Sequence, residues 1–115
     1  ASEECPVTDA YKNMILEAVD TSTTLTGEKF GAPVRGIKNE LTKKYHELEE
    51  QSSTLMELEE LTLGSLRRAV YDGDVENGSV MAGQIAGLVT EIRPVKNIIE
   101  DVIKEAREVL KKTEI

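Results

Sequence analysis

The residues whose types and spacing could bind a ligand are concentrated in residues 73–89, which read GDVENGSVMAGQIAGLV. A helix beginning here at about Ser79 would carry Gly83 and Gly87 in its interior, and each costs about 1 kcal/mol relative to alanine. These glycines are four residues apart, as are the alanines that directly precede them, so one face of the helix is nearly flat. Such a face lets another backbone or a planar ligand approach closely.

The start of this expected helix offers a second kind of chemistry. Asn77, Gly78 and Ser79 would leave free N–H groups at the positive end of a helix dipole, where an anion or an electron-rich carbonyl can be held. Tight packing against another helix is the simpler physical interpretation of the same small residues. The two interpretations stay open at this point.

The same stretch is similar to the C-terminal signature of the FMN-dependent enoyl-acyl-carrier-protein reductases II and their relatives, the nitronate monooxygenases, also called 2-nitropropane dioxygenases. Residues 30–39, FGAPVRGIKN, resemble the G-x-P-V-R-x-x-K-N stretch of that family. Residues 63–69, LGSLRRA, resemble the lead-in to the signature. The resemblance covers essentially the whole chain.

Members of this family have a TIM-type barrel that carries FMN, followed by a small, mostly helical domain that closes over the flavin. A barrel takes about 250 residues, so the resemblance implies that residues 1–115 are one unit, a helical cap and C-terminal helix without the barrel strands. The catalytic histidine of the family would then lie outside the chain. We therefore expect no catalytic residue and no metal ligand here, and an inactive isolated chain.

The resemblance implies that the parent protein reduces enoyl-acyl-carrier-protein with NAD(P)H in fatty-acid synthesis, with FMN passing the hydride to the β-carbon of the enoyl thioester. The alternative is a nitronate monooxygenase that oxidises alkyl nitronates. A second alternative, from another class, is a non-enzymatic acidic helical module that binds a partner helix through its apolar stripes. The signature does not separate the two enzymes.

The resemblance also implies a set of cofactor-binding residues that face the flavin or the substrate channel. Met81 offers soft apolar contact, and Gln84 can hydrogen-bond as donor and acceptor. The full set is Ser79, Met81, Ala82, Gly83 and Gln84. Candidate partners are the barrel part of the parent chain, acyl carrier protein and a second copy of the chain.

Composition limits the other partners and the location. A net charge of -8 argues against nucleic acid, which is bound through clustered Lys and Arg. A single cysteine, Cys5, allows no internal disulfide and no Cys-based zinc site. No apolar run is long enough to span a bilayer and no signal-peptide pattern is present, so we expect a soluble, cytoplasmic protein without a membrane partner.

Two charged groups have interpretations of their own. His46, the single histidine, lies among lysines and glutamates and is read as a solvated surface residue. Arg67 and Arg68, with Lys43 and Lys44, could attract an acidic carrier protein or a cofactor phosphate, because Arg forms bidentate bonds to such oxygens. A solvated helix face is the simpler interpretation.

The elements that must position these residues are short helices and one hairpin. Thr8 caps a predicted helix over residues 8–20, and the β-branched residues 21–26 predict a strand that pairs with residues 34–37. Three helices are predicted to follow, after Asn39, after Thr54 with Glu57 as a capping box, and after Ser65. Pro94 opens the last helix, which has an apolar stripe over residues 95–110. The predicted fold class is mostly α with a short β-hairpin.

Overall fold

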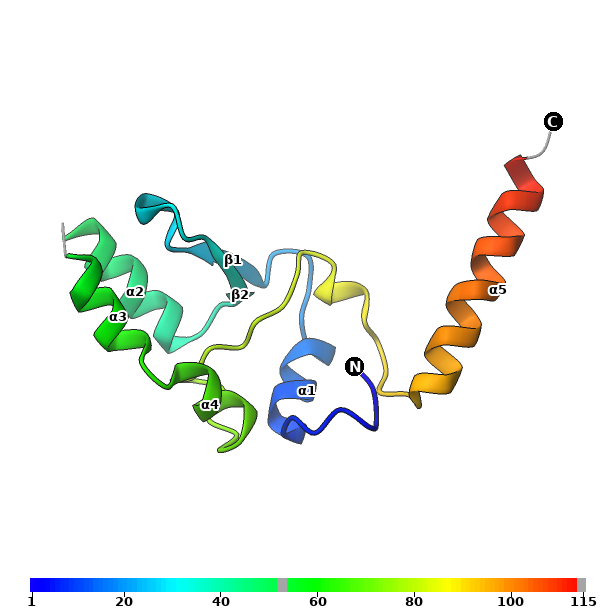
Figure 1. Cartoon of the computed structure of the whole chain (residues 1–115), viewed down its shortest axis with the longest axis horizontal. Coiled ribbons are helices and arrows are strands. Elements are labelled where there is room, and N and C mark those ends of the chain that lie inside the picture. The colour runs from blue at the N-terminus through cyan, green and yellow to red at the C-terminus, as the bar shows by residue number, and fades with distance from the viewer. Residues whose placement is uncertain (52–53, 114–115) are drawn as a thin grey trace. The chain divides into compact units, whose positions relative to one another are not determined.

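The computed structural model describes residues 1–51 and 54–113 and shows helices and one two-stranded sheet (Figure 1). The α-helices are α1 (Asp9–Leu16), α2 (Glu40–Glu50), α3 (Leu55–Thr62), α4 (Ser65–Val70) and α5 (Val95–Thr113). The strands are β1 (Thr23–Thr26) and β2 (Val34–Ile37), and the 3-10 helices are η1 (Glu28–Phe30) and η2 (Ala86–Leu88). The predicted fold class, mostly α with one hairpin, is confirmed.

The chain divides into two compact units. One is Val7–Thr90, and the other joins Ala1–Pro6 to Glu91–Ile115. The larger unit holds the hairpin, four of the α-helices and the 73–89 segment. The expectation that residues 1–115 form a single unit stays a prediction.

The predicted hairpin is present as an antiparallel pair. Thr23 lies opposite Ile37 and Thr26 lies opposite Val34. The β-branched threonines of β1 suit an extended backbone, and η1 fills the connection between the strands. Gly27 supplies the left-handed backbone that starts this connection, at φ 81°.

Helix α1 begins as predicted but ends at Leu16, so the predicted extent of residues 8–20 is wrong at its C-terminus. Thr8 Oγ1 accepts a hydrogen bond from the Tyr11 N–H, which is the expected cap. Beyond the helix, Ser22 Oγ accepts from the Val19 N–H at 2.8 Å. A serine that bonds the backbone locally competes with the helical pattern and favours a turn.

Helix α2 is fixed by a capping box. The Asn39 side chain accepts from the Thr42 N–H, and the Thr42 hydroxyl accepts from the Asn39 N–H. In α3 the Thr54 hydroxyl accepts from the Glu57 N–H, which is the Thr54 half of the box predicted there. Leu58 of α3 is fully buried, at 1% exposure.

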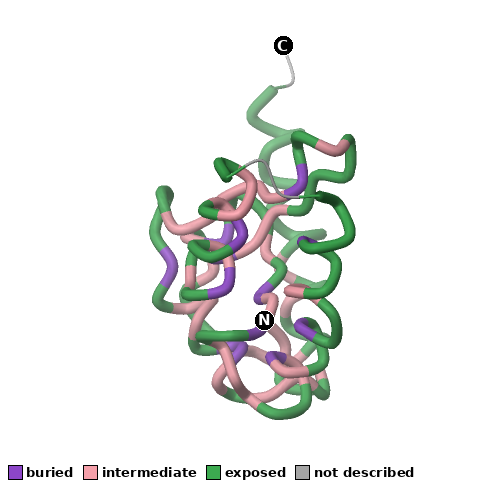
Figure 2. The backbone as a smooth tube through the Cα atoms, turned by 90° about the vertical axis from the view of Figure 1, so that its left-hand side faces the viewer, coloured by how far each residue is buried: buried purple, intermediate pink, exposed green. Residues whose placement is uncertain are grey.

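The buried positions of the chain are scattered among intermediate and exposed ones (Figure 2), and the core of the larger unit is a single small cluster. Its buried members are Tyr11, Ala18, Ile37, Ala69, Val80 and Ala86. Val80 is 2% exposed and is one of the most deeply buried of them. Ile85 and Leu88, which follow in the same segment, are 70% and 78% exposed.

The helix predicted to begin at Ser79 is not formed. Residues 79–85 are irregular, with a bridge at Met81, and only Ala86–Leu88 make one turn of 3-10 helix. Glycines inside the stretch weaken its helical propensity, while the free edge of β2 offers hydrogen-bond partners. The Ile37 N–H donates to the Val80 carbonyl at 2.8 Å, and the Ala82 N–H donates to the Arg35 carbonyl at 3.3 Å.

The smaller unit contains α5. Val95, its first residue, donates its N–H to the Glu4 carboxylate at 2.7 Å, where a negative charge also suits the positive end of the helix dipole. Pro94 directly precedes the helix. No residue of the described part of α5 is buried, so the predicted apolar stripe is exposed in this chain. None of the described helices is long and apolar enough to cross a membrane.

Candidate functional site

The 73–89 segment is held in place at Met81 by contacts that are distant in sequence. Met81 forms an antiparallel bridge with Gly36 of β2. Its carbonyl accepts a hydrogen bond of 2.7 Å from the Tyr11 hydroxyl of α1. These bonds fix the backbone of Met81, while its side chain is 46% exposed.

Ser79, two residues earlier, is tied to α4. Its N–H donates to the Ser65 carbonyl at 2.9 Å, and the two serine hydroxyls lie 2.6 Å apart. Ser65 is buried, at 5% exposure. One hydroxyl hydrogen lies between the two oxygens, so the pair still offers a donor or an acceptor to a third group.

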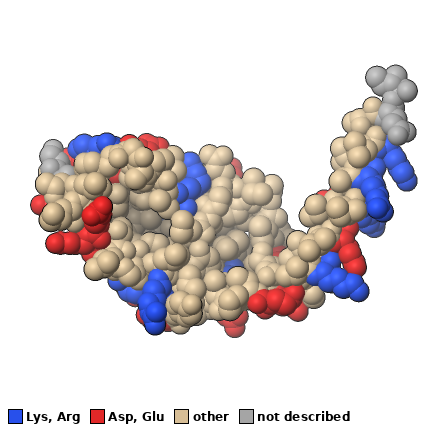
Figure 3. All heavy atoms as spheres, in the orientation of Figure 1, with Lys and Arg blue, Asp and Glu red and all other residues tan. Residues whose placement is uncertain are grey.

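A hollow of about 340 Å³ lies between the hairpin and helices α3 and α4, and we call it the hairpin groove. Its apolar wall consists of Ala32, Val34, Leu55, Leu58, Leu66 and Met81. Its polar groups belong to Thr26, Tyr45, Glu59, Thr62, Ser65 and Ser79. Figure 3 shows it as a recess in a largely uncharged surface. An apolar pocket with a few polar groups is the usual form of a small-molecule site.

Among the residues that contribute polar groups to the groove, Ser65 is the most buried and Tyr45, at 9% exposure, comes second. Burial raises the pKa of its phenol, and the negative charges of Glu49 and Glu59 raise it further. No hydrogen bond joins the Tyr45 hydroxyl to another described residue, and its oxygen is in reach of solvent, since no buried side-chain oxygen or nitrogen of the described residues lacks a partner.

The structure separates the five residues predicted to contact the flavin. Ser79 and Met81 line the hairpin groove. Ala82 is half-buried against the core, and a side chain added at Gly83 would meet no atom within 4 Å. Gln84 lines a different hollow, of about 240 Å³, with Asp20, Ile85, Gly87 and Leu88. Their role in cofactor binding stays a prediction.

The predicted anion site at the start of a helix is absent, because there is no helix and the chain itself uses the N–H groups. The Asn77 N–H donates to the Asp74 carboxylate at 3.0 Å. The Gly78 N–H donates to the Asp74 carbonyl, and the Ser79 N–H donates to Ser65. The first two N–H groups close a turn and the third ties the segment to α4, so none of them faces a ligand.

Asp74 makes this turn sensitive to acid. The hydrogen bond from the Asn77 N–H holds the pKa of its carboxyl below the ordinary 3.8, with a smaller contribution from the Asn77 side chain. A lowered pKa adds stability above pH 3.8 that is lost as the pH falls through the folded-state pKa. We expect the wild type to be more stable than Asp74→Asn above pH 3.8. The difference in their free energies of unfolding should shrink as the pH falls through the folded-state pKa of Asp74, as measured by urea denaturation at several pH values. An advantage that stays constant down to the acid limit would contradict this assignment.

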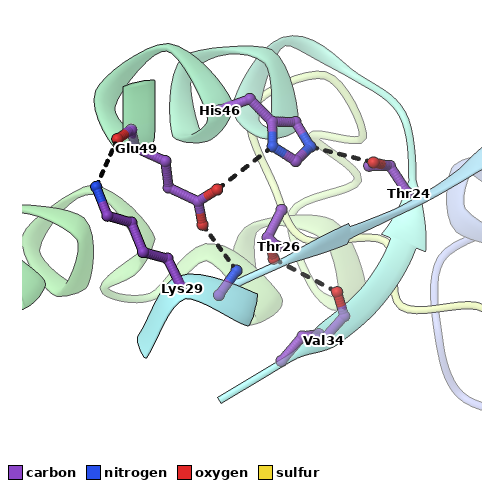
Figure 4. A network of polar contacts seen from close by, with 7 residues as sticks. Thr24, Thr26, Lys29, Val34, His46 and Glu49 are labelled. Carbon is purple, nitrogen blue, oxygen red and sulfur yellow. Dashed lines mark hydrogen bonds and ion pairs between the residues drawn. The ribbon is translucent and has the colours of Figure 1, made fainter. Parts of the chain in front are cut away.

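His46 lies in a polar network that joins α2 to the hairpin (Figure 4). Its Nε2 is 3.1 Å from the Thr24 hydroxyl, and its Nδ1 is 3.7 Å from the Glu49 carboxylate. Glu49 also accepts from the Gly27 N–H at 2.9 Å. His46 lies at the surface as expected, with a side chain that is 38% exposed, and its ring also ties α2 to the hairpin.

The arginines before the signature also have structural partners. The Arg68 guanidinium donates to the carbonyls of Asn77 and Leu63 at 3.1–3.3 Å. The Arg67 guanidinium lies 5.1 Å from the centre of the Tyr71 ring, within cation–π range. Attraction of a carrier protein or a phosphate by these residues stays a prediction.

Tyr11 is the buried residue that most directly supports Met81, which makes it a test of how the segment is held. We expect Tyr11→Phe to destabilise the larger unit by about 1 kcal/mol, because the Met81 carbonyl loses its donor. Thermal or urea unfolding measures the change. Tyr71→Phe is the control, since Tyr71 is 70% exposed and should change stability by less than about 0.5 kcal/mol. Equal losses for the two variants would contradict the role of the Met81 bond.

The hydroxyls of Tyr11 and Tyr45 were not among the groups predicted to form a site. A tyrosine on a buried face must find a partner for its O–H or open into a cavity. That signal could have directed attention to both residues. The partner of the Tyr11 hydroxyl, the Met81 carbonyl, is however 70 residues away, and periodicity cannot locate it.

Comparison with known proteins connects this geometry to a family. The model of the nitronate monooxygenase family matches residues 1–105. A probable nitronate monooxygenase of Staphylococcus saprophyticus is 28% identical over 109 residues, which is 95% of this chain and 30% of that protein.

Solved structures agree with this match. The structure of FabK from Thermotoga maritima is similar over 96% of this chain and 35% of its own, with 46% identity and a TM-score of 0.89. A methionine-to-alanine mutant of the same FabK is similar over 96% of the chain and 32% of its own, with 40% identity and a TM-score of 0.80. The chain thus spans about a third of these relatives. Because the family model covers more than nine-tenths of its length, the chain belongs to the nitronate monooxygenase family.

Proposed function

We propose that this chain is the C-terminal part of an FMN-dependent oxidoreductase that reduces enoyl-acyl-carrier-protein with NAD(P)H in fatty-acid synthesis. The observation that carries the proposal is the similarity to FabK of Thermotoga maritima, with 46% identity and a TM-score of 0.89 over 96% of the chain. FabK proteins are the FMN-dependent enoyl-acyl-carrier-protein reductases II of this family. The 28% identity to the probable nitronate monooxygenase is considerably lower.

The nitronate monooxygenase activity is the second candidate. It is favoured by the description of the matching family and by the name of the relative from Staphylococcus saprophyticus. This enzyme would oxidise alkyl nitronates instead of reducing an enoyl thioester. Both candidates are flavoenzymes, and both are better supported by the comparisons than a free-standing interaction module.

The flavin would be shared with sequence outside this chain. FMN supplies hydride transfer when bound, and the protein orients it and excludes water. The Met81 side chain and the open backbone at Gly83 could cover an isoalloxazine ring. No Lys or Arg lines the hairpin groove, so it fits an uncharged ring or chain better than the FMN phosphate.

The barrel of the parent protein is the proposed partner of the exposed apolar side chains. Ile85 and Leu88 in the larger unit are exposed, as is the apolar stripe of α5, which includes Ile99, Val102 and Ile103. Apolar surface of this extent in a small chain usually meets a partner. The relatives are about three times as long as this chain, which leaves ample sequence to cover it.

A chimera can test the function with this chain. The matching segment of Thermotoga maritima FabK is replaced by the 115-residue chain, and the purified protein is assayed for bound flavin, for NAD(P)H oxidation with an enoyl thioester and for oxygen consumption with an alkyl nitronate. We expect bound FMN and enoyl reduction within about tenfold of the unmodified enzyme, since the fold matches throughout.

The other outcomes decide against the proposal. Bound FMN with nitronate oxidation and no enoyl reduction would favour the second candidate. A folded chimera without flavin would contradict both. The isolated chain serves as a further control, because it should not quench flavin fluorescence if the phosphate-binding part of the site is elsewhere.

A further inference from the structure

The hairpin groove has a largely apolar wall, and neither of the two proposed activities by itself says what binds there. Its wall combines leucine, valine and methionine side chains that remain partly exposed, such as Leu66 at 46% and Val34 at 42%. Leu58, fully buried, forms part of the same wall. Partly exposed apolar side chains that face one recess can be covered by a single apolar ligand, and the release of water from them stabilises the complex.

One end of the groove carries an unused donor. The Tyr45 hydroxyl lies 3.4 Å from the position that a Cβ of Gly27 would take, next to Thr26 and close to Ala32. Thr26 and Ala32 both line the groove. The hydroxyl carries its proton, since burial only raises the pKa of the phenol from its ordinary 10.0, and it makes no hydrogen bond to another described residue. A hydroxyl that is in reach of solvent and makes no hydrogen bond within the described chain can exchange its bond to water for one to a ligand carbonyl.

The charges around the groove exclude a free acid. Among the described residues, Glu59 is the charged one that lines the wall, and none of the lining residues is Lys or Arg. Glu49 also lies close enough to affect Tyr45. A ligand carboxylate would be repelled by these groups and would find no cation. The groove therefore suits an uncharged ester or thioester with an apolar tail.

We infer that the hairpin groove binds the acyl chain of an acyl thioester, with the Tyr45 hydroxyl donating to a carbonyl oxygen. This inference rests on the proposed function, since an acyl thioester is the substrate class of the reductase and an alkyl nitronate is not. It places substrate recognition in the cap, on residues from the hairpin, α2, α3 and α4. Met81 and Ser79 connect the groove to the segment predicted to face the flavin.

Binding to the 115-residue chain alone tests this inference without any flavin. The probes are the decanoyl thioester of N-acetylcysteamine, which is neutral, and decanoate, which is charged, followed by methyl NMR shifts and calorimetry. We expect saturable binding of the thioester, shifts at Leu58 and Leu66 rather than at Ile99 and Ile103 of α5, and at least tenfold weaker binding of decanoate.

Two substitutions of leucine by tryptophan make a matched pair. Leu66→Trp fills the groove and should weaken thioester binding by tenfold or more, whereas Leu63→Trp, at a residue that is 79% exposed and outside the groove, should leave it unchanged. Tyr45→Phe removes only the hydroxyl and should weaken binding about threefold to tenfold. Circular dichroism establishes that each variant remains folded.

Three results would overturn the inference: no saturable thioester binding by the wild type, equal losses for the two tryptophan variants, or decanoate binding as tightly as the thioester. None of these bears on flavin content or enoyl reduction by the chimera. Failure of the groove and failure of the proposed function are therefore distinguishable.

Discussion

Replacing Gly78 with alanine is expected to destabilise the larger unit by about 3 kcal/mol or more. A Cβ at this position would lie 2.5 Å from the Asp74 carbonyl oxygen, 2.7 Å from the Ala69 nitrogen and 2.9 Å from the Ala69 Cβ. Ala69 is completely buried, and two of these three atoms are backbone, so a side-chain rotation cannot relieve the contacts. Urea denaturation of Gly78→Ala against the wild type measures the loss.

Gly83→Ala is the matched control within the same segment. A Cβ at Gly83 meets no atom within 4 Å, and its φ is not positive. The substitution should be neutral or stabilise by up to about 1 kcal/mol, because alanine restricts the unfolded chain. If both variants lose stability alike, the segment is not packed as described. If Gly83→Ala loses stability and Gly78→Ala does not, then Gly83 is the closely packed glycine and Gly78 is not, which contradicts the structure.

Asn39→Ala is expected to cost about 3 kcal/mol, the second large effect. The Asn39 amide accepts from the Thr42 N–H as the cap of α2, and it donates to the carbonyls of Val75 and Gly78, each at 2.7 Å. Loss of a cap costs about 1 kcal/mol, and each of the other two bonds adds about 1 kcal/mol. Thermal unfolding followed by circular dichroism measures the sum.

Two comparisons separate the contributions of Asn39. Asn39→Ser keeps a capping oxygen but cannot reach both carbonyls, so it should recover about 1 kcal/mol relative to Asn39→Ala. Thr54→Ala removes an exposed cap with a single bond and should cost about 1 kcal/mol. If Asn39→Ala costs no more than Thr54→Ala, the two bonds to the turn contribute nothing.

Local features of the fold could be predicted from the sequence because their causes are local. Thr8 and Asn39 cap the helices that they were expected to cap, and β2 spans the four residues expected of it. The extent of α1 could not be predicted, since the Ser22 hydroxyl stops the pattern before its apolar periodicity ends. Local side-chain bonds of this kind compete with the helix.

The 73–89 segment could not be predicted correctly, because its conformation depends on a distant strand. The spacing of alanine and glycine indicated one face of a helix. In the structure, the backbone groups of Val80 and Ala82 form hydrogen bonds with β2, which lies more than 40 residues earlier in the chain. Close approach at the glycines was anticipated in part. A Cβ at Gly87 would lie 2.8 Å from the Val19 backbone, while Gly83 faces open space.

The residues of the candidate site were also predicted only in part. Of the residues taken over from the family, Ser79 and Met81 lie in the hairpin groove, and the remaining three do not. Tyr45 was absent from that set, because its hydroxyl reaches the groove only after α2 has packed against the hairpin. No spacing in the sequence encodes that contact.

The pairing of residues 80–82 with β2 also has a consequence for the behaviour of the chain in concentrated solution. A two-stranded hairpin presents unpaired N–H and C=O groups along both sides, and such rows are templates for pairing with other molecules. Here the N–H of Ile37 and the carbonyl of Arg35 are already occupied by the chain itself. A substitution that detaches the segment, such as Gly78→Ala, would therefore promote aggregation as well as unfolding.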